Sequence, residues 1–184
     1  MLKHTVLAAA VASALLLAGC ASQAPAPAPA PPPAVDANAW TARLATLKAS
    51  LEAATRGTGV VIEQTADNQL HVVMPADRSF DVGRATLRRD LSEMLDKIAE
   101  GLRSATRASI LIVGHTDATG GDSANEKLSL ARADNARSLL VSRGVLGSIV
   151  KAEGRGEREP VADNHTAGGR AQNRRVEIYI SEKG

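Results

Sequence analysis

Residues 109–144 constrain the fold of this chain most, because they read as a buried strand, a polar loop and a long helix in direct succession. Ser109–Val113 is a short apolar run rich in β-branched residues, which predicts a buried strand. Ser123 and Glu126 in the following segment fit the Ser-x-x-Glu capping box that starts helices. The helix is expected to stop at Gly144, since glycine is the usual residue past a helix C-terminus.

The predicted helix carries an apolar stripe and a polar stripe. Its expected core side consists of Leu128, Ala131 and Leu139. The polar stripe beside it consists of residues spaced at i, i+4 and i+7, namely Asn125, Ser129 and Arg132. Asp117 lies on the preceding loop, so its carboxylate and the guanidinium of Arg132 can face one small space. That pair suits a ligand that carries both an ammonium and a carboxylate.

The other patterns complete a predicted α+β architecture. Val60–Gln64 and Leu70–Met74 are two β-prone runs around a turn, which predict a hairpin. Apolar residues at helical spacing predict an amphipathic helix over Gly83–Leu102. The later elements are a weaker strand, a long polar loop and a last strand with one buried face, at Ile149–Ala152, Gly154–Gln172 and Val176–Ile180. This order predicts a mixed β-sheet with helices packed on one face.

Residues 1–19 are predicted to be a lipoprotein signal peptide. Thr5–Leu17 is a short apolar stretch after a charged start, and it is too short to span a bilayer as a mature helix. Leu17-Ala18-Gly19-Cys20 resembles the lipobox of bacterial lipoproteins, which implies cleavage before Cys20 and acylation of this single cysteine. By the same resemblance, Ala21 in the next position favours sorting to the outer membrane. The alternative is an ordinary signal peptide followed by a chance cysteine.

Residues 20–35 comprise this cysteine and an Ala/Pro-rich linker. Its run Ala24–Ala34 tends to polyproline II and would reach roughly 34 Å at about 3.1 Å per residue. Residues 36–57 are predicted to form an amphipathic helix, with Asp36 as N-cap and Gly57 as stop. Its apolar face consists of Trp40, Leu44, Leu47 and Leu51. This face packs on the domain formed by residues 58–184 or pairs with another protein; packing is favoured, since two heptads are too few for a convincing coiled coil.

Three spaced sequence blocks carry a family resemblance. They are Phe80 with Gly83 and Leu87; Ile110–Asp117 followed by Gly120, Asn125, Leu128-Ser129 and Ala131-Arg132-Ala133; and Gly154–Ile178, which includes Asn173-Arg174-Arg175. The blocks span roughly residues 70–181 and resemble OmpA-like peptidoglycan-binding domains, in the family's order. The resemblance implies the OmpA C-terminal fold and non-covalent binding of peptidoglycan through diaminopimelate of its stem peptide.

The resemblance also implies roles for single residues. Asp117 and Arg132 match the residues that hold diaminopimelate in the family, although they could instead pair only with each other as a structural bridge. Asn125 positions either the ligand or the loop, and Thr116 either offers its hydroxyl to the ligand or shapes the turn. Arg174 matches the first arginine of the family's Asn-Arg-Arg motif and would add a second cation. Two alternatives stay open, whether Arg174 or Arg175 faces the pocket and whether Phe80 is a core anchor or a ligand contact.

Other chemistry is disfavoured by the sequence. His115 is interpreted as a structural hydrogen-bonding residue, because no other histidine or mature-domain cysteine shows metal-ligand spacing with it. No nucleophile elbow and no phosphate loop appears, so neither a catalytic site nor a cofactor is expected. The formal net charge is only +2, and no basic run or aromatic platform predicts a nucleic-acid partner.

The leading hypothesis is therefore an outer-membrane lipoprotein that is not an enzyme. Cys20 would be anchored in lipid, and the domain in the periplasm would bind peptidoglycan and so tether the membrane to the wall. An alternative is a component of an envelope or secretion assembly, in which the Trp40–Leu51 helix binds a protein partner and the wall site only positions it. A cell-wall-modifying enzyme is the weakest reading.

Overall fold

The computed structural model describes residues 38–81 and 83–183. These residues form one five-stranded sheet in the order β1-β2-β5-β3-β4, in which β3 and β4 are parallel and all other neighbours are antiparallel. The strands are β1 (Val61–Gln64), β2 (Leu70–Pro75), β3 (Ala108–Gly114), β4 (Val150–Gly154) and β5 (Arg175–Glu182). The helices are α1 (Ala42–Ala54), α2 (Ala76–Ser79), α3 (Arg89–Leu102), α4 (Asp122–Ser142) and α5 (Ala167–Asn173), with a 3-10 turn at Gly147–Ile149.

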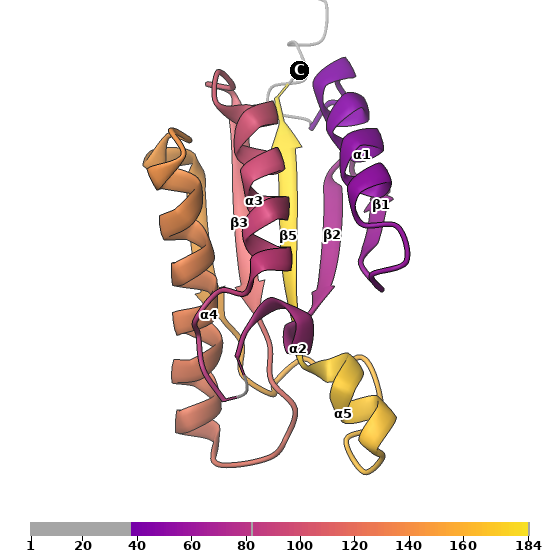
Figure 1. Ribbon diagram of the computed structural model, residues 1–184, viewed down its shortest axis with the longest axis vertical. Coiled ribbons are helices and arrows are strands. Elements are labelled where there is room, and N and C mark those ends of the chain that lie inside the picture. Colours follow the sequence, from indigo (N-terminus) through magenta and orange to yellow (C-terminus); the bar gives the residue numbers. More distant parts are fainter. Residues whose placement is uncertain (1–37, 82, 184) are drawn as a thin grey trace, which may run out of the picture. The chain divides into compact units, whose positions relative to one another are not determined.

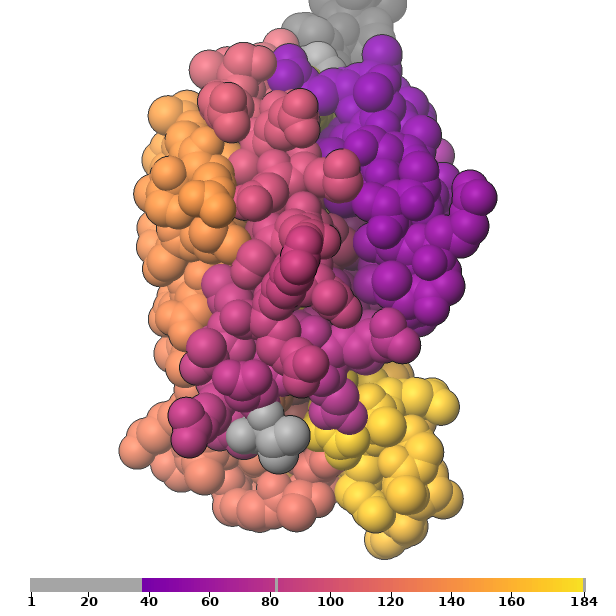
Figure 2. All heavy atoms as spheres, viewed as in Figure 1, coloured from indigo at the N-terminus to yellow at the C-terminus, as the bar shows by residue number. Residues whose placement is uncertain are grey.

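The helices α1, α3 and α4 lie on one face of the sheet, as the α+β prediction requires (Figure 1). Alternate residues of the strands point toward them and are fully buried, for example Ile110 and Ile112 of β3 and Ile178 of β5. The atoms of these helices cover that face in the space-filling view (Figure 2). Each fully buried aliphatic side chain stabilises the fold by about 1.5–3 kcal/mol, so this layer holds the sheet and the helices together.

The N-terminal helix α1 is part of the same hydrophobic core. Leu44, Leu47 and Leu51 are buried there, which confirms that this face packs on the domain. The less favoured alternative, in which this face pairs with another protein, is not the arrangement found here, and a protein partner of the Trp40–Leu51 helix stays a prediction. The Thr41 hydroxyl caps the helix by accepting a hydrogen bond from Leu44 N (3.2 Å), and the helix ends at Ala54, before the predicted stop. The predicted N-cap Asp36, like the signal peptide, Cys20 and the linker, lies outside the described residues.

The amphipathic helix α3 begins at Arg89 and not at Gly83 as predicted. Residues 83–88 instead lie outside the helix; Gly83 has a φ of 66°, and Leu87 bridges to Phe80. Arg88 N donates to Ser79 O (2.8 Å), so this segment is tied back to the end of α2. The apolar stripe of α3 is buried as predicted; it consists of Leu91, Met94, Leu95, Ile98 and Leu102.

The long helix α4 starts and faces differently from the prediction. It begins at Asp122 after Gly121, with no side-chain cap, so Ser123 and Glu126 form no capping box. Its buried face is the polar stripe itself, extended by small and apolar residues: Asn125, Ser129, Arg132, Ala133, Ala136 and Leu140. Ala131, predicted to be in the core, is exposed.

Two strand glycines explain why α4 turns its polar stripe inward. A Cβ atom at Gly114 would lie 2.2 Å from Ser129 O, and one at Gly154 would lie 2.5 Å from Leu130 N. The backbone of α4 therefore rests directly on β3 and β4, where only short or well-bonded side chains fit. This close approach brings Asn125, Ser129 and Arg132 to the carboxyl ends of the two parallel strands.

Candidate functional site

The loop after β3 is fixed by Asn125 from the first turn of α4. Its Nδ2 donates to Asp117 O (3.2 Å), Thr119 O (3.3 Å) and Glu157 Oε2 (2.6 Å). Asn125 is buried and spends its donors on the protein, so in this structure it positions the loop. Positioning of the loop is one of the two roles that the family resemblance implied for Asn125.

A second tie joins the same loop to the segment after β4. Thr116 N donates to Gly156 O (2.9 Å), and Gly156 N donates to the Ser129 hydroxyl (2.9 Å). The Thr116 hydroxyl itself is buried and has no hydrogen-bond partner among the described residues. The turn is thus shaped by the backbone of Thr116, and its hydroxyl is left with unused bonding capacity beside Asp117.

Asp117 and Arg174 form an ion pair at the mouth of this loop. Arg174 Nη1 lies 2.6 Å from Asp117 Oδ2, and Thr119 N donates to Asp117 Oδ1 (2.9 Å). Burial raises the pKa of Asp117, but the hydrogen bonds from Arg174 and Thr119 outweigh it and hold that pKa below its ordinary value. Asp117 is therefore an anion in the folded protein.

The other side of the Arg174 guanidinium binds Asp77, a residue of α2 that the sequence interpretation missed. Arg174 Nε donates to Asp77 Oδ1 (2.9 Å) and Nη2 donates to Asp77 Oδ2 (2.7 Å). The hydrogen bond from Arg174 lowers the pKa of Asp77, and the two carboxylates together raise that of Arg174. The sequence left open whether Arg174 or Arg175 faces the pocket, and in this structure Arg174 is the one that contacts Asp117. Nothing in the spacing of Asp77 from the motifs could have signalled this pair.

Arg132 is a buried cation without a carboxylate partner in the described part of the chain. Arg132 is only 5% exposed, and its Nε donates to Arg84 O (3.0 Å). The guanidinium carbon lies 5.1 Å from the centre of the Phe80 ring, a cation–π distance. Arg132 and Asp117 do not pair, so the alternative in which they form a structural bridge with each other is wrong.

Electrostatics nevertheless place the four charged residues in one cluster. Burial lowers the pKa of Arg132. The charges of Asp77 and Asp117 raise this pKa and the charge of Arg174 lowers it, each by less than burial does. Phe80 is buried and lies under Arg132, which makes it a core anchor that supports the site. We call Asp77, Asp117, Arg132 and Arg174 the charge cluster.

A second polar network lies on the sheet surface that the helices do not cover. Arg175 Nε lies 2.5 Å from Glu177 Oε1, and His71 Nε2 lies 3.3 Å from Glu177 Oε2. His71 also stacks on Tyr179, with ring centres 4.3 Å apart. This network buries Glu177. Residues on both faces of β5 are therefore buried, whereas the alternating pattern predicted one buried face.

His115 is buried at the edge of this network, and neither ring nitrogen has a hydrogen-bond partner in the described structure. Burial lowers its pKa to about 4, and the nearby Arg175 acts in the same direction. It was predicted to be a structural hydrogen-bonding residue; it is instead a neutral ring packed without such bonds. The residues that the structure describes hold no group of three or more His, Cys, Asp or Glu side chains arranged to bind a metal ion.

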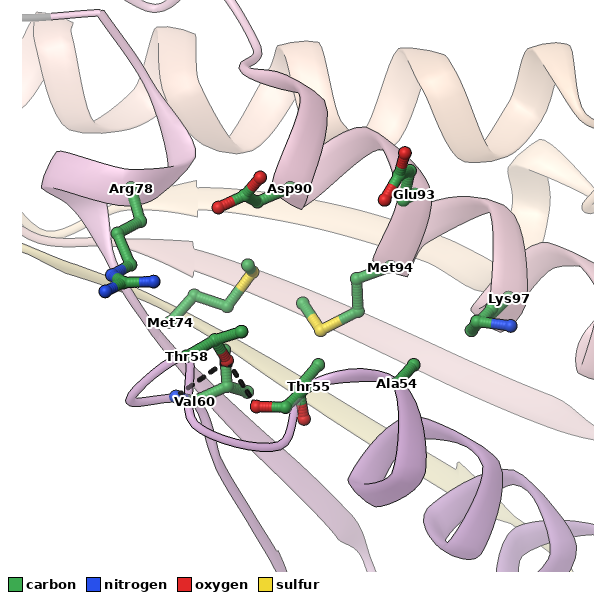
Figure 3. Close-up of a pocket in the computed structure, with 10 residues that line it drawn as sticks. All are labelled: Ala54, Thr55, Thr58, Val60, Met74, Arg78, Asp90, Glu93, Met94 and Lys97. Atoms are coloured by element: carbon green, nitrogen blue, oxygen red, sulfur yellow. Dashed lines mark hydrogen bonds between the residues drawn. The ribbon is translucent and has the colours of Figure 1, made fainter.

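A separate pocket of about 160 Å³ lies between the end of α1, α2 and α3 (Figure 3). Met74 and Met94 reach into it from opposite sides, and the charged side chains of Arg78, Asp90 and Glu93 stand around it. It contains none of the charge cluster and none of the residues predicted to bind ligand.

In the described part of the chain, no helix combines the length and apolarity needed to cross a membrane.

Comparisons with known proteins agree with this architecture. The model of the OmpA family matches residues 79–174. The probable lipoprotein YiaD of Escherichia coli (strain K12) is 40% identical over 134 residues, which are 73% of this chain and 61% of that protein. This chain therefore spans about three fifths of the length of that relative.

Two solved structures have the same fold. The cell wall anchor of the T6SS from Pseudomonas aeruginosa superposes with a TM-score of 0.63 and 35% identity, over 76% of this chain and 97% of that one. The peptidoglycan-associated lipoprotein from Burkholderia pseudomallei gives a TM-score of 0.52 and 31% identity, over 55% and 86%. Since the family match covers more than half of the 184 residues and includes the charge cluster's Asp117, Arg132 and Arg174, the chain belongs to the OmpA family and contains an OmpA C-terminal-like domain.

Proposed function

We propose that this protein binds peptidoglycan non-covalently by gripping the diaminopimelate of a stem peptide in the charge cluster. Arg132 would pair the distal carboxylate of diaminopimelate, and Asp117 would accept the distal ammonium. Thr116 would add its unused hydroxyl, Asn125 would hold the loop that carries Asp117, and Arg174 would stand as a second cation beside the ligand. Relatives whose names mention peptidoglycan or the cell wall support the wall polymer as ligand.

The observation that carries this proposal is the unpaired state of Arg132. Burial of an ion is expensive unless the ion is paired, and a guanidinium binds a carboxylate through two parallel hydrogen bonds. Arg132 uses Nε on a backbone carbonyl and rests on Phe80, while no carboxylate of the described residues comes within ion-pair distance, 4.0 Å. A ligand carboxylate would complete the site.

The wider role we propose is a tether and not an enzyme. Cys20 would be acylated and held in the outer membrane, with the domain in the periplasm. Many weak sites along one wall polymer would give avidity, so that a modest affinity at each site suffices. Loss of labelled fatty acid in a Cys20→Ser variant would support the anchor, and equal labelling of both proteins would refute it. Positioning a larger envelope assembly is a second candidate role, because one structural relative is the cell wall anchor of the T6SS.

The test of the wall site is titration of a diaminopimelate-containing stem peptide into the full chain in detergent micelles. Asp117→Ala and Arg132→Ala should each lower the affinity by roughly tenfold to a hundredfold, because a hydrogen bond between charged groups is worth about 1.5–3 kcal/mol. Arg132→Lys should also bind less tightly, since lysine keeps the charge but not the planar fork.

Two exposed residues supply matched controls. Asp134 on α4 is exposed and forms no ion pair with the residues that the structure describes, so Asp134→Ala should bind as the wild type does. Arg143→Lys alters an exposed arginine that pairs with Asp96, far along the helix from the site. Circular dichroism would establish that each variant is folded. Folded Asp117→Ala and Arg132→Ala proteins that bind as tightly as wild type would disprove the proposal.

A further inference from the structure

The charge cluster contains a carboxylate that the proposed ligand contacts do not use. Asp77 comes from α2, the single turn between β2 and the loop that carries Phe80. Its side chain is 57% exposed, yet both of its oxygens bind the Arg174 guanidinium, at 2.9 and 2.7 Å. The two segments are also joined through the backbone, because Ala76 N donates to Arg174 O (2.9 Å). Figure 1 shows α2 lying where the chain passes from α5 into β5.

In the free protein, Arg174 occupies the place on Asp117 that an ammonium would take. Its Nη1 donates to Asp117 Oδ2 (2.6 Å), and Thr119 N already uses the other oxygen. An incoming ammonium must therefore displace or share this contact. If Asp117 were the sole anionic partner of Arg174, the ammonium would displace it. Arg174, whose side chain is 30% exposed, would then lie beside the ammonium without a counter-charge.

We infer that Asp77 is a positioning residue that lets Asp117 exchange its contact with Arg174 for one with a ligand ammonium. Asp77 holds Arg174 through two parallel hydrogen bonds, so Arg174 stays paired when the ammonium takes Asp117 Oδ2. The charges then balance in pairs: Asp77 offsets Arg174, Asp117 meets the ammonium, and Arg132 meets the carboxylate. This inference rests on the proposed function and assigns Asp77 to the recognition of the ammonium half of the ligand alone.

The test separates the two halves of the ligand. One stem peptide carries diaminopimelate, and a second carries 2-aminopimelate, which keeps the distal carboxylate but lacks the distal ammonium. Asp77→Asn should weaken binding of the diaminopimelate peptide about tenfold, the scale of one charge-assisted contact, because Arg174 would then compete for Asp117 without a second partner. Binding of the 2-aminopimelate peptide should not change. Asp134→Asn makes the same charge change at an exposed position of α4 and should leave both affinities unaltered.

A double variant distinguishes competition from a structural fault. Asp77→Asn combined with Arg174→Gln removes both the holder and the competitor, so it should regain the preference for diaminopimelate over 2-aminopimelate that Asp77→Asn loses. Asp77→Asn that keeps the wild-type preference, or a double variant that does not regain it, would overturn the inference and leave the proposed function standing. A wild-type protein that binds both peptides equally would overturn the inference together with the ammonium contact of the proposed function.

Discussion

At the scale of single residues, Arg132 is a buried charge that no carboxylate of the described residues neutralises. Its guanidinium is buried with one backbone hydrogen bond and one aromatic ring as neighbours, and without a carboxylate in the described residues. An unpaired buried charge costs free energy that an apolar side chain of similar volume does not cost. The position therefore makes sense as part of a binding site that is completed by a ligand.

We expect Arg132→Met to abolish binding of the stem peptide and yet to raise the free energy of unfolding by about 1 kcal/mol, since methionine can pack on Phe80 without a desolvated charge. Urea denaturation measures this change. Arg137→Met is the matched control, because Arg137 is half-buried and donates to Val150 O (3.0 Å) and Gly147 O (3.4 Å). The control should lose stability. An Arg132→Met protein destabilised as much as the control would show that Arg132 is a structural residue.

His115 predicts a pH dependence of stability. Its pKa is near 6.5 in the unfolded chain and about 4 in the folded protein, because burial disfavours the charged ring. Between these values the unfolded chain binds the proton and the folded protein does not, so the free energy of unfolding falls as the pH drops from about 6.5 toward 4. The full effect is on the order of 3 kcal/mol.

The measurement is the free energy of unfolding of wild type and His115→Leu between pH 7.5 and about 4.5. Leucine gives up no hydrogen bond, because neither ring nitrogen makes one within the described structure. Wild type should lose stability relative to the variant as the pH falls, and taking the difference removes the contributions of titrating groups that do not interact with His115. Parallel curves for the two proteins would mean that His115 keeps its ordinary pKa.

At the scale of elements, the contact of α4 with β3 and β4 decides where the site lies. Gly114 and Gly154 let the helix backbone approach the strands, and Arg132 and Asn125 are carried inward as a result. Gly154→Ala would place a methyl group 2.5 Å from Leu130 N, so the helix would have to shift. We expect a loss of stability of about 1–3 kcal/mol, the usual cost of overpacking, and weaker peptide binding.

The matched control for this prediction is Gly168→Ala in α5, where a new Cβ meets nothing within 4 Å and φ is not positive. That variant should be as stable as wild type or slightly more stable, since alanine is the better helix former. Thermal unfolding of the two variants compares them directly. A Gly154→Ala protein that unfolds at the temperature of the control would show that α4 is not held against the strands by close backbone contact.

The strands and helices show how far the sequence could predict the structure. The strand Ser109–Val113, the stop at Gly144, the hairpin and the apolar stripe of α3 follow from local patterns and are confirmed. The inward face of α4 was predicted wrongly, because a periodicity count assumes that apolar residues face the core. Here two glycines on distant strands set the packing, and the polar residues are buried by bonds to the loop instead.

The sequence likewise predicted only part of the candidate site. Asp117, Arg132 and Arg174 were found through a family motif, and the structure brings them into one cluster. Their pairing was not predictable, because Asp77 lies 97 residues from Arg174 in the chain and in no motif. The buried Glu177 network was likewise hidden, since alternation along one strand does not show what covers its second face.

At the scale of the whole molecule, the five-stranded sheet and its helices support the charge cluster that we propose as the ligand site. The sheet and helices hold the loop of Asp117, the helix of Arg132 and the start of β5 in fixed relation, as the tie of Ala76 N to Arg174 O and that of Asn125 to the loop illustrate. The proposed site is therefore formed in the free protein, and we expect recognition to depend on matching two opposite charges on one carbon of the stem peptide.

The most direct test of this claim changes the ligand and leaves the protein intact. Titration of the wild-type chain with a diaminopimelate-type and a lysine-type stem peptide compares ligands that differ at the distal carbon, where lysine lacks the carboxylate. Arg132 would then have no partner, so binding of the lysine-type peptide should be about tenfold weaker or more. Equal affinity for the two peptides would contradict the account, because the buried guanidinium would then play no part in recognition.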